Sequence, residues 1–400
     1  MKRVLVLLNS LIFTVVVFAQ QPVDYLIKAK ALTDNGKARE AIMLLSEALS
    51  KSQDNRFYLQ RADAYVSVGD YSNAIADYQS ADKIAVGSGE YGLSRIYALK
   101  GDVKTSLYHL DLNISSSFKK SEKEIMLDPA FSVIENTPDW RQFWKKERYN
   151  VFEKKIPEIE YYISTGNREE VNSILSALTN DYPDNNSTQY AKALVDFSVQ
   201  NYTGAITILT KLTSADRKNE VWLRLLAKTQ AVSGNHAGAS LTYSQLIDLG
   251  IADAKLFLNR AECYRETGEY DKALKDLSGY LDLYPDNKDA LSLTGKIESE
   301  SGDNLKALDY FSKNLKLHPN DADCYVDRAN SYFISSTWNY AISDYSMALD
   351  IQPANPDVWL NKGIALLNTG KTDDACHDFR KALSLGNKKA TSYISKNCIK

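Results

Sequence analysis

Six alanines recur every 34 residues through the second half of this 400-residue chain, at Ala205, Ala239, Ala273, Ala307, Ala341 and Ala375. A second column, usually glycine, runs five positions ahead of the alanines. Its members are Gly234, Gly268, Gly302 and Gly370, with Gly36, Gly69, Gly101 and Gly166 upstream. A fixed period of this size predicts an array of small helical units, each stacked only on its neighbours. Such an array presents a long surface suited to holding other molecules.

The segment 55–88 shows what one unit contains. Small and aromatic residues recur at spacings of three, four and seven on both sides of Gly69-Asp70, at Tyr58, Ala62, Tyr65, Ala74, Tyr78 and Ala81. This spacing predicts two amphipathic helices joined by a tight turn. The glycine allows the left-handed backbone that ends the first helix, and a proline often follows the second.

The aromatic, small, glycine and alanine positions of this unit resemble the tetratricopeptide repeat family. Two repeats depart from the pattern at the turn, where Gln200 and Ser336 replace glycine. The resemblance implies an all-α fold, an α-solenoid of about ten helix-turn-helix repeats that forms a right-handed superhelix. The ten repeats begin near Pro22, Asn55, Gly87, Phe152, Asn186, Glu220, Ala254, Lys288, Ala322 and Pro356.

The repeat pattern is interrupted once, which predicts five segments along the chain. These are a signal peptide (1–19), an N-terminal module of three repeats (20–117), an atypical helical insert (118–149), a C-terminal module of seven repeats (150–388) and a capping helix (389–400). We expect Trp140, Phe143 and Trp144 of the insert to plug the end of the third repeat. An aromatic ligand cage is the alternative interpretation.

The first residues have the features of a secretory signal. Lys2 and Arg3 precede a fifteen-residue apolar run, and short residues lead to a cleavage site after Ala19. An uncleaved anchor is the alternative, although a spanning helix needs roughly 20 apolar residues. The junction resembles those of exported Bacteroidota proteins, which implies the periplasm; an extracellular location is the other possibility.

Charge and motifs exclude several classes of function. The formal net charge is −3, whereas a nucleic-acid binder needs a basic face. The run 87–92 spells a dinucleotide fingerprint but follows a helix rather than the required strand. Cys376 and His377 are the metal-like pair, yet adjacent residues point to different faces of a helix. The sequence therefore predicts no enzyme activity, no metal site and no cofactor.

Four cysteines raise the question of disulfides. Cys263 and Cys324 belong to the seventh and ninth repeats. Stacked helix pairs advance by roughly 10 Å per repeat, while a disulfide needs Cα atoms within about 7 Å. We expect these two to be free thiols. Cys376 and Cys398 lie on the last repeat and the following helix, where a bridge is possible.

Charged residues at positions 7 and 23 of the repeat change together. Arginine at position 7 accompanies aspartate at position 23 in three repeats, and the tenth repeat has lysine with aspartate. An arginine turned toward a neighbouring helix must find a carboxylate, so structural ion pairs are predicted rather than a catalytic or anion-binding row. The pairs are Arg61 with Asp77, Arg260 with Asp276, Arg328 with Asp344, and Lys362 with Asp378.

The resemblance also implies where ligands bind, because members of the family usually bind them in a concave groove lined by first helices. Transferred to this chain, the groove positions include Tyr190, Leu194, Phe197, Val326, Asn330, Phe333, Leu360, Asn361, Ile364 and Leu367. Their apolar character favours contact with a partner; the alternative is that packing buries them. Because Asp323, Asp327 and Asp357 stand where a carboxylate clamp needs cations, capture of an acidic C-terminus is not expected.

These features favour a non-enzymatic scaffold or adaptor of the bacterial cell envelope that binds segments of other proteins in the groove. A self-assembling structural component of the envelope is the alternative. An enzyme or glycan-binding protein would need long loops carrying clustered carboxylates or aromatics, and only the insert 118–149 is long enough. The partner's identity and the oligomeric state stay open.

Overall fold

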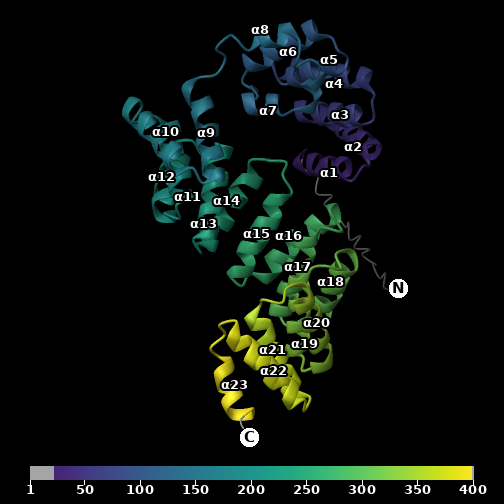
Figure 1. The fold of residues 1–400 in the computed structure, drawn as a ribbon. Coiled ribbons are helices and arrows are strands. Elements are labelled where there is room, and N and C mark those ends of the chain that lie inside the picture. The colour runs from purple at the N-terminus through teal and green to yellow at the C-terminus, as the bar shows by residue number, and fades with distance from the viewer. Residues whose placement is uncertain (1–21, 399–400) are drawn as a thin grey trace, which may run out of the picture. The chain divides into compact units, whose positions relative to one another are not determined.

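The computed structural model describes residues 22–398, so the predicted signal peptide lies outside the described residues. Within this range the chain forms twenty-three α-helices, one short 3-10 helix and no strand (Figure 1). The all-α prediction is therefore confirmed. None of the helices in residues 22–398 combines the length and the apolar composition that crossing a bilayer requires. The helices fall into two compact units, residues 1–118 and 119–400.

The first unit contains the first three predicted repeats as three helix pairs. They are α1 (Pro22–Asp34) with α2 (Ala38–Lys51), α3 (Asn55–Ser67) with α4 (Tyr71–Ile84), and α5 (Glu90–Leu99) with α6 (Val103–Ile114). Each helix packs on the next along the chain, and the first helices of successive repeats also contact one another.

The second unit contains the seven remaining repeats. They are α9 (Val151–Thr165) with α10 (Arg168–Asp181), α11 (Asn186–Ser198) with α12 (Tyr202–Ala215), α13 (Glu220–Val232) with α14 (His236–Asp248), α15 (Lys255–Glu266) with α16 (Tyr270–Leu283), α17 (Lys288–Glu300) with α18 (Asn304–Leu317), α19 (Ala322–Ile334) with α20 (Trp338–Ile351), and α21 (Pro356–Asn368) with α22 (Thr372–Ser384). Each pair packs on the next, as Figure 1 shows within this unit. The first helices α15, α17 and α19 contact one another in succession.

The predicted insert is helical, although Asp128-Pro129 and Thr137-Pro138, each with an N-cap residue ahead of proline, indicate only two of its three elements. Its two proline-started elements are the 3-10 helix Pro129–Val133 and α8 (Pro138–Phe143). A third element, α7 (Glu122–Met126), was not predicted, although Ser121 and Glu124 form a capping box at its start. The rings of Trp140 and Trp144 meet edge to face, 5.7 Å apart. That these aromatics plug the third repeat stays a prediction.

Every repeat makes the same left-handed turn between its two helices. Eight repeats place a glycine there, with positive φ at Gly36, Gly69, Gly101, Gly166, Gly234, Gly268, Gly302 and Gly370. The other two keep the conformation without glycine, with φ of 65° at Gln200 and 56° at Ser336. A residue with a Cβ pays about 1–2 kcal/mol for this conformation.

We expect Ser336→Gly to raise the free energy of unfolding by about 1 kcal/mol, because it removes this backbone strain. The matched control is Gly370→Ser. No atom lies within 4 Å of the added Cβ, so the loss of stability comes from the backbone conformation alone. This control should lower stability by a similar amount. Urea denaturation measures both changes, and a destabilised Ser336→Gly variant would refute the strain.

The core is built from small residues where two helices cross. All six alanines of the 34-residue column are fully buried. Two repeats go further and place glycine on the first helix against phenylalanine on the second. A Cβ added at Gly295 would lie 2.5 Å from the Phe311 ring, and one at Gly363 would lie 2.6 Å from the Phe379 ring. Glycine on one helix thus makes room for the larger ring on the other.

Glu298 is a buried carboxylate on α17, and its ion-pair partner Lys306 lies 3.9 Å away. Burial raises the pKa of the Glu298 carboxyl above its usual value. The folded state therefore holds this proton more tightly than the unfolded state. Stability falls as the pH rises from the ordinary carboxyl pKa through the raised one.

We expect Glu298→Gln to stabilise the chain by about 1 kcal/mol at neutral pH, since it removes a poorly compensated buried charge. The gain should shrink as the pH is lowered toward 4, where Glu298 is protonated. Thermal unfolding at a series of pH values measures this dependence. The exposed Glu169→Gln serves as control and should show no such trend; equal behaviour of the two variants would contradict the prediction.

The last helix is α23 (Ala390–Asn397), within the segment 389–400 predicted as a cap. Tyr393 stacks on Phe379 of α22, with ring centroids 5.0 Å apart. A disulfide joins Cys376 to Cys398, whose Cα atoms are 5.6 Å apart. Cys263 and Cys324 are buried free thiols. Burial raises the pKa of Cys263 to about 11 and that of Cys324 to about 12, so both are protonated at neutral pH.

Candidate functional site

The arginines at position 7 each donate to three oxygen atoms of two side chains, with the same geometry. In the ninth repeat, Arg328 donates from Nε and Nη2 to the two carboxylate oxygens of Asp344, at 2.7 and 2.8 Å. Its remaining nitrogen, Nη1, donates to Ser312 Oγ at 3.1 Å. Arg61 repeats this arrangement with Asp77 and Ser46, and Arg260 repeats it with Asp276 and Ser244.

These arginines form side-chain contacts between neighbouring repeats. The aspartate lies on the second helix of the same repeat, whereas the serine lies on the second helix of the preceding one. The guanidinium therefore joins three helices, for example α18, α19 and α20. Sequence reasoning missed the serine, although its spacing of 15 or 16 residues before each arginine was visible. Because both edges of the guanidinium are occupied, these arginines do not form an anion-binding row.

The tenth repeat shows what lysine does in the same place. Lys362 Nζ lies 3.3 Å from Asp378 Oδ2, and it also lies over the Trp359 ring. A single ammonium group cannot form the bidentate contact that arginine makes with a carboxylate. Asp378 Oδ2 accordingly has no hydrogen bond of good geometry. Burial raises the pKa of the Asp378 carboxyl, against the opposing effect of Lys362.

The ten groove residues named from the sequence are less accessible than expected. Tyr190 and Leu360 are buried, and the other eight are half-buried. The apolar ones pack against neighbouring core clusters. Asn330 Oδ1 accepts a hydrogen bond from the hydroxyl of buried Tyr345, at 2.6 Å. This amide oxygen is therefore already occupied within the repeat.

Open space lies along the first helices of repeats seven to nine, where Asn330 is the one residue of these ten that lines it. Two cavities of about 350 and 340 Å³ lie along α15, α17 and α19 and share Arg265 and Lys296 in their linings. We call their combined lining the first-helix groove. The first cavity is lined from α15 by Leu258, Asn259, Glu262 and Arg265, from α17 by Lys288, Asp289, Ser292, Leu293 and Lys296, and from the α19 end by Asp321 and Asp323. The second adds Ser299, Glu300, Phe311, Asp327, Asn330, Ser331 and Ile334.

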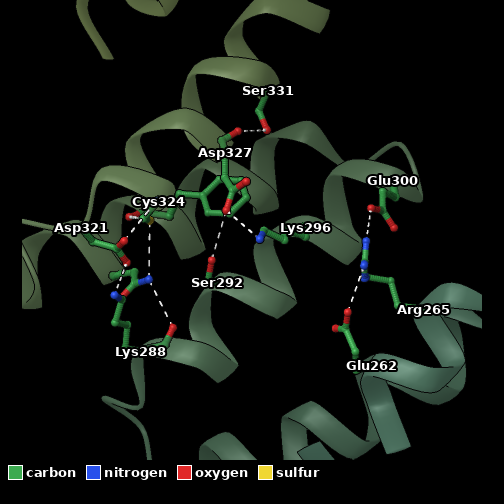
Figure 2. Close-up of polar contacts among 12 residues, drawn as sticks. Glu262, Arg265, Lys288, Ser292, Lys296, Glu300, Asp321, Cys324, Asp327 and Ser331 are labelled. Atoms are coloured by element: carbon green, nitrogen blue, oxygen red, sulfur yellow. Dashed lines mark hydrogen bonds and ion pairs between the residues drawn. The ribbon is translucent and has the colours of Figure 1, made fainter. Parts of the chain in front are cut away.

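Arg265 lies between carboxylates from two repeats (Figure 2). Its guanidinium is 3.0 Å from Glu262 Oε1 on its own helix and 2.6 Å from Glu300 Oε1 on α17. Glu266 is a further partner. Burial lowers the pKa of Arg265, but these carboxylates outweigh it and raise the pKa above its ordinary value. Arg265 therefore stays charged and joins α15 to α17.

A second contact joins α17 to α19, and Figure 2 shows it beside the first. Asp327 Oδ2 lies 3.1 Å from Lys296 Nζ and accepts from Ser292 Oγ at 3.3 Å. Burial raises the pKa of the Asp327 carboxyl, and Lys296 and Ser292 oppose this effect. Lys288 pairs with Asp321 at 3.3 Å. Each of the three cations in the lining is thus bound to a carboxylate of the chain.

A larger cavity, of about 490 Å³, lies between the insert and the first helices α9, α11 and α13. Phe152, Ile156, Tyr190 and Trp222 line it together with charged and polar residues such as Lys119. Tyr190 is the predicted groove residue found there. Residues 22–398 contain no group of three or more histidine, cysteine or acidic side chains placed to hold a metal ion.

Comparison with known proteins decides the family. Two models described as tetratricopeptide repeat match this chain, one at residues 28–88, 224–288 and 258–322 and the other at 345–377. The chain is a tetratricopeptide repeat protein. No curated protein matches it.

Two solved structures show the same fold of tetratricopeptide repeats. A tetratricopeptide repeat protein from Parabacteroides merdae ATCC 43184 is 20% identical, with 61% of this chain and 97% of that chain covered and a TM-score of 0.50. The Cut9-Hcn1 hetero-tetramer of the APC/C is 15% identical, with 94% and 83% covered and a TM-score of 0.51. At these identities the likeness concerns the fold alone.

The tetratricopeptide register explains which groove residues the sequence analysis missed. The predicted groove residues belong to the fifth, ninth and tenth repeats, and none belongs to the seventh or eighth. The same positions there give Leu258, Asn259, Glu262 and Arg265 on α15, and Ser292 and Lys296 on α17. The repeat register therefore marked these positions. The prediction favoured apolar residues, whereas the rim of this groove is charged.

Proposed function

We propose that this tetratricopeptide repeat protein is a non-enzymatic scaffold that binds segments of partner proteins along the first-helix groove. The match to the family supports a protein–protein interaction scaffold in general. The observation that carries the finer proposal is the pair of adjoining cavities lined by three successive first helices. First-helix positions of three successive repeats line the cavities at regular steps, which suits an extended chain.

Affinity capture from cells tests the groove. Ser292 lines the first cavity from α17 and is half-buried, so that Ser292→Trp should fill the cavity. The control, Asp309→Trp, adds the same bulk at an exposed position on α18, the second helix of the same repeat. We expect Ser292→Trp to lose specific partners that the native chain and the control both retain. Identical partner sets for all three proteins would contradict binding in the groove.

Export to the cell envelope is part of the same proposal. It is supported by the charged, apolar and short-residue order of residues 1–19. N-terminal sequencing of the protein recovered from fractionated cells tests it. A mature chain beginning at Gln20 in the periplasmic fraction is expected, whereas an intact Met1 on cytoplasmic protein would contradict export.

Self-assembly is the second candidate. Some large apolar side chains on second helices are highly exposed, notably Leu241, Leu305 and Tyr340. Light scattering of the mature chain after size exclusion distinguishes the two: a concentration-independent oligomer that Leu305→Glu dissociates favours assembly, and a monomer favours the scaffold.

A further inference from the structure

We infer that the partner segment in the first-helix groove is basic, an extended stretch whose lysine or arginine side chains enter the cavity beside Asp289 and Asp323. This inference rests on the proposed function and adds the chemistry of the occupant. Three features of the groove carry it: the cations are already bound, two carboxylates are free, and two leucines line the same cavity.

The cations of the groove are not available to an acidic partner. Arg265 is held by Glu262 and Glu300, and Lys296 is held by Asp327. Lys288 is paired with Asp321. An incoming carboxylate would have to displace a carboxylate that the fold already supplies. The lining as a whole carries six carboxylates against three cations, so its electrostatic potential disfavours a negative segment.

Two carboxylates of the first cavity remain without a partner. Asp289 and Asp323 stand at the same position of successive repeats, 34 residues apart, and both side chains are exposed. Among the described residues neither one makes an ion pair or a side-chain hydrogen bond. Each lies in the first turn of its helix, where a negative charge interacts favourably with the helix dipole. That interaction explains why aspartate is tolerated there, but it leaves the carboxylate oxygens free to bind a cation.

The walls of the cavity fit the stem of a basic side chain. Leu258 from α15 and Leu293 from α17 line the same cavity as the two aspartates. Lysine and arginine carry several methylene groups that pack on apolar surface while the charged end stays at a polar rim. Leu293 is buried and Leu258 is half-buried, and a small acidic or uncharged polar side chain would leave the exposed part of Leu258 uncovered. Charge and shape therefore favour the same occupant.

Fluorescence anisotropy with labelled peptides tests the inference on the full mature chain. The probes are three peptides of equal length in which alanine alternates with lysine, glutamate or asparagine. We expect the lysine peptide to bind more tightly than the other two, and its affinity to fall as salt is added. The double variant Asp289→Asn with Asp323→Asn should raise its Kd about five- to tenfold, as expected for two exposed ion pairs. The control, Asp271→Asn with Asp309→Asn, removes two exposed carboxylates from second helices and should leave the Kd unchanged.

The outcomes separate this inference from the proposed function. Equal or tighter binding of the glutamate or asparagine peptide, abolished by Ser292→Trp, would overturn the basic occupant and retain the groove. Tight binding of the lysine peptide that both double variants weaken equally would show general attraction to an acidic protein, and would overturn the site. If no peptide binds and Ser292→Trp loses no cellular partner, the proposed function fails together with the inference.

Discussion

Replacing Asp344 with alanine should lower the free energy of unfolding of the repeats around α19 and α20 by about 3–5 kcal/mol. Asp344 is buried, and both its oxygens bind Arg328, whose side chain is only 20% exposed. Loss of the carboxylate leaves a permanently charged guanidinium without its counter-ion in a desolvated position. Urea denaturation followed by circular dichroism, with hydrogen exchange to localise the change, measures the effect.

Two companion variants show which part of the loss comes from the unpaired charge. Ser312→Ala removes the third contact of Arg328 and should cost only about 1 kcal/mol, the usual value for one hydrogen bond. Arg328→Leu combined with Asp344→Leu removes both charges, and replacement of a buried pair by apolar residues is often neutral or stabilising. The double variant should therefore be more stable than Asp344→Ala. An unfolding midpoint that Asp344→Ala leaves unmoved would contradict the structural role of the pair.

Removal of the disulfide should be the second large effect. Cys376→Ser with Cys398→Ser frees a loop with a sequence separation of 22 residues, which corresponds to about 3 kcal/mol in the chain-entropy model. In a stack of repeats the loss is local, because each repeat depends mainly on its neighbours. We expect α22 and α23 to exchange amide protons faster, while α9 to α14 keep their protection.

Reducing agent provides the control for the disulfide. It should destabilise the native chain to the level of the double serine variant and leave that variant unchanged, because Cys263 and Cys324 are already reduced. Equal stability of the native chain with and without reductant would show that the bridge contributes nothing to the cap.

Residue spacing predicted most of the fold because the same small unit recurs. Spacing along the helices, the turn column and the closing prolines place all ten pairs near their observed bounds. The turn needs a left-handed residue in every repeat, and the sequence marks it with glycine in eight of ten. The predicted cap and the ionic residues at positions 7 and 23 follow from the same register. The short helix α7 escaped prediction because its five residues are too few for a periodic pattern.

Contacts between repeats were harder to predict, since no spacing within one unit encodes them. Ser312 completes the Arg328 site from the previous repeat, and Glu300 reaches Arg265 from the next one. Asn330 was assigned to a ligand because of its position, but its amide oxygen serves the Tyr345 hydroxyl. Apolar groove positions were favoured on the sequence, and packing half-buries most of them.

Photo-crosslinking in living cells tests most directly whether the first-helix groove holds a partner. A benzophenone amino acid is placed at Asn259, an exposed residue of the groove on α15, and separately at Lys275, an exposed residue of α16. We expect the Asn259 probe to capture a defined protein through a lysine- or arginine-rich peptide. Ser292→Trp should abolish this capture, and the Lys275 probe should not capture this protein. Capture of the same proteins from both positions, or capture unaffected by Ser292→Trp, would contradict binding in this groove.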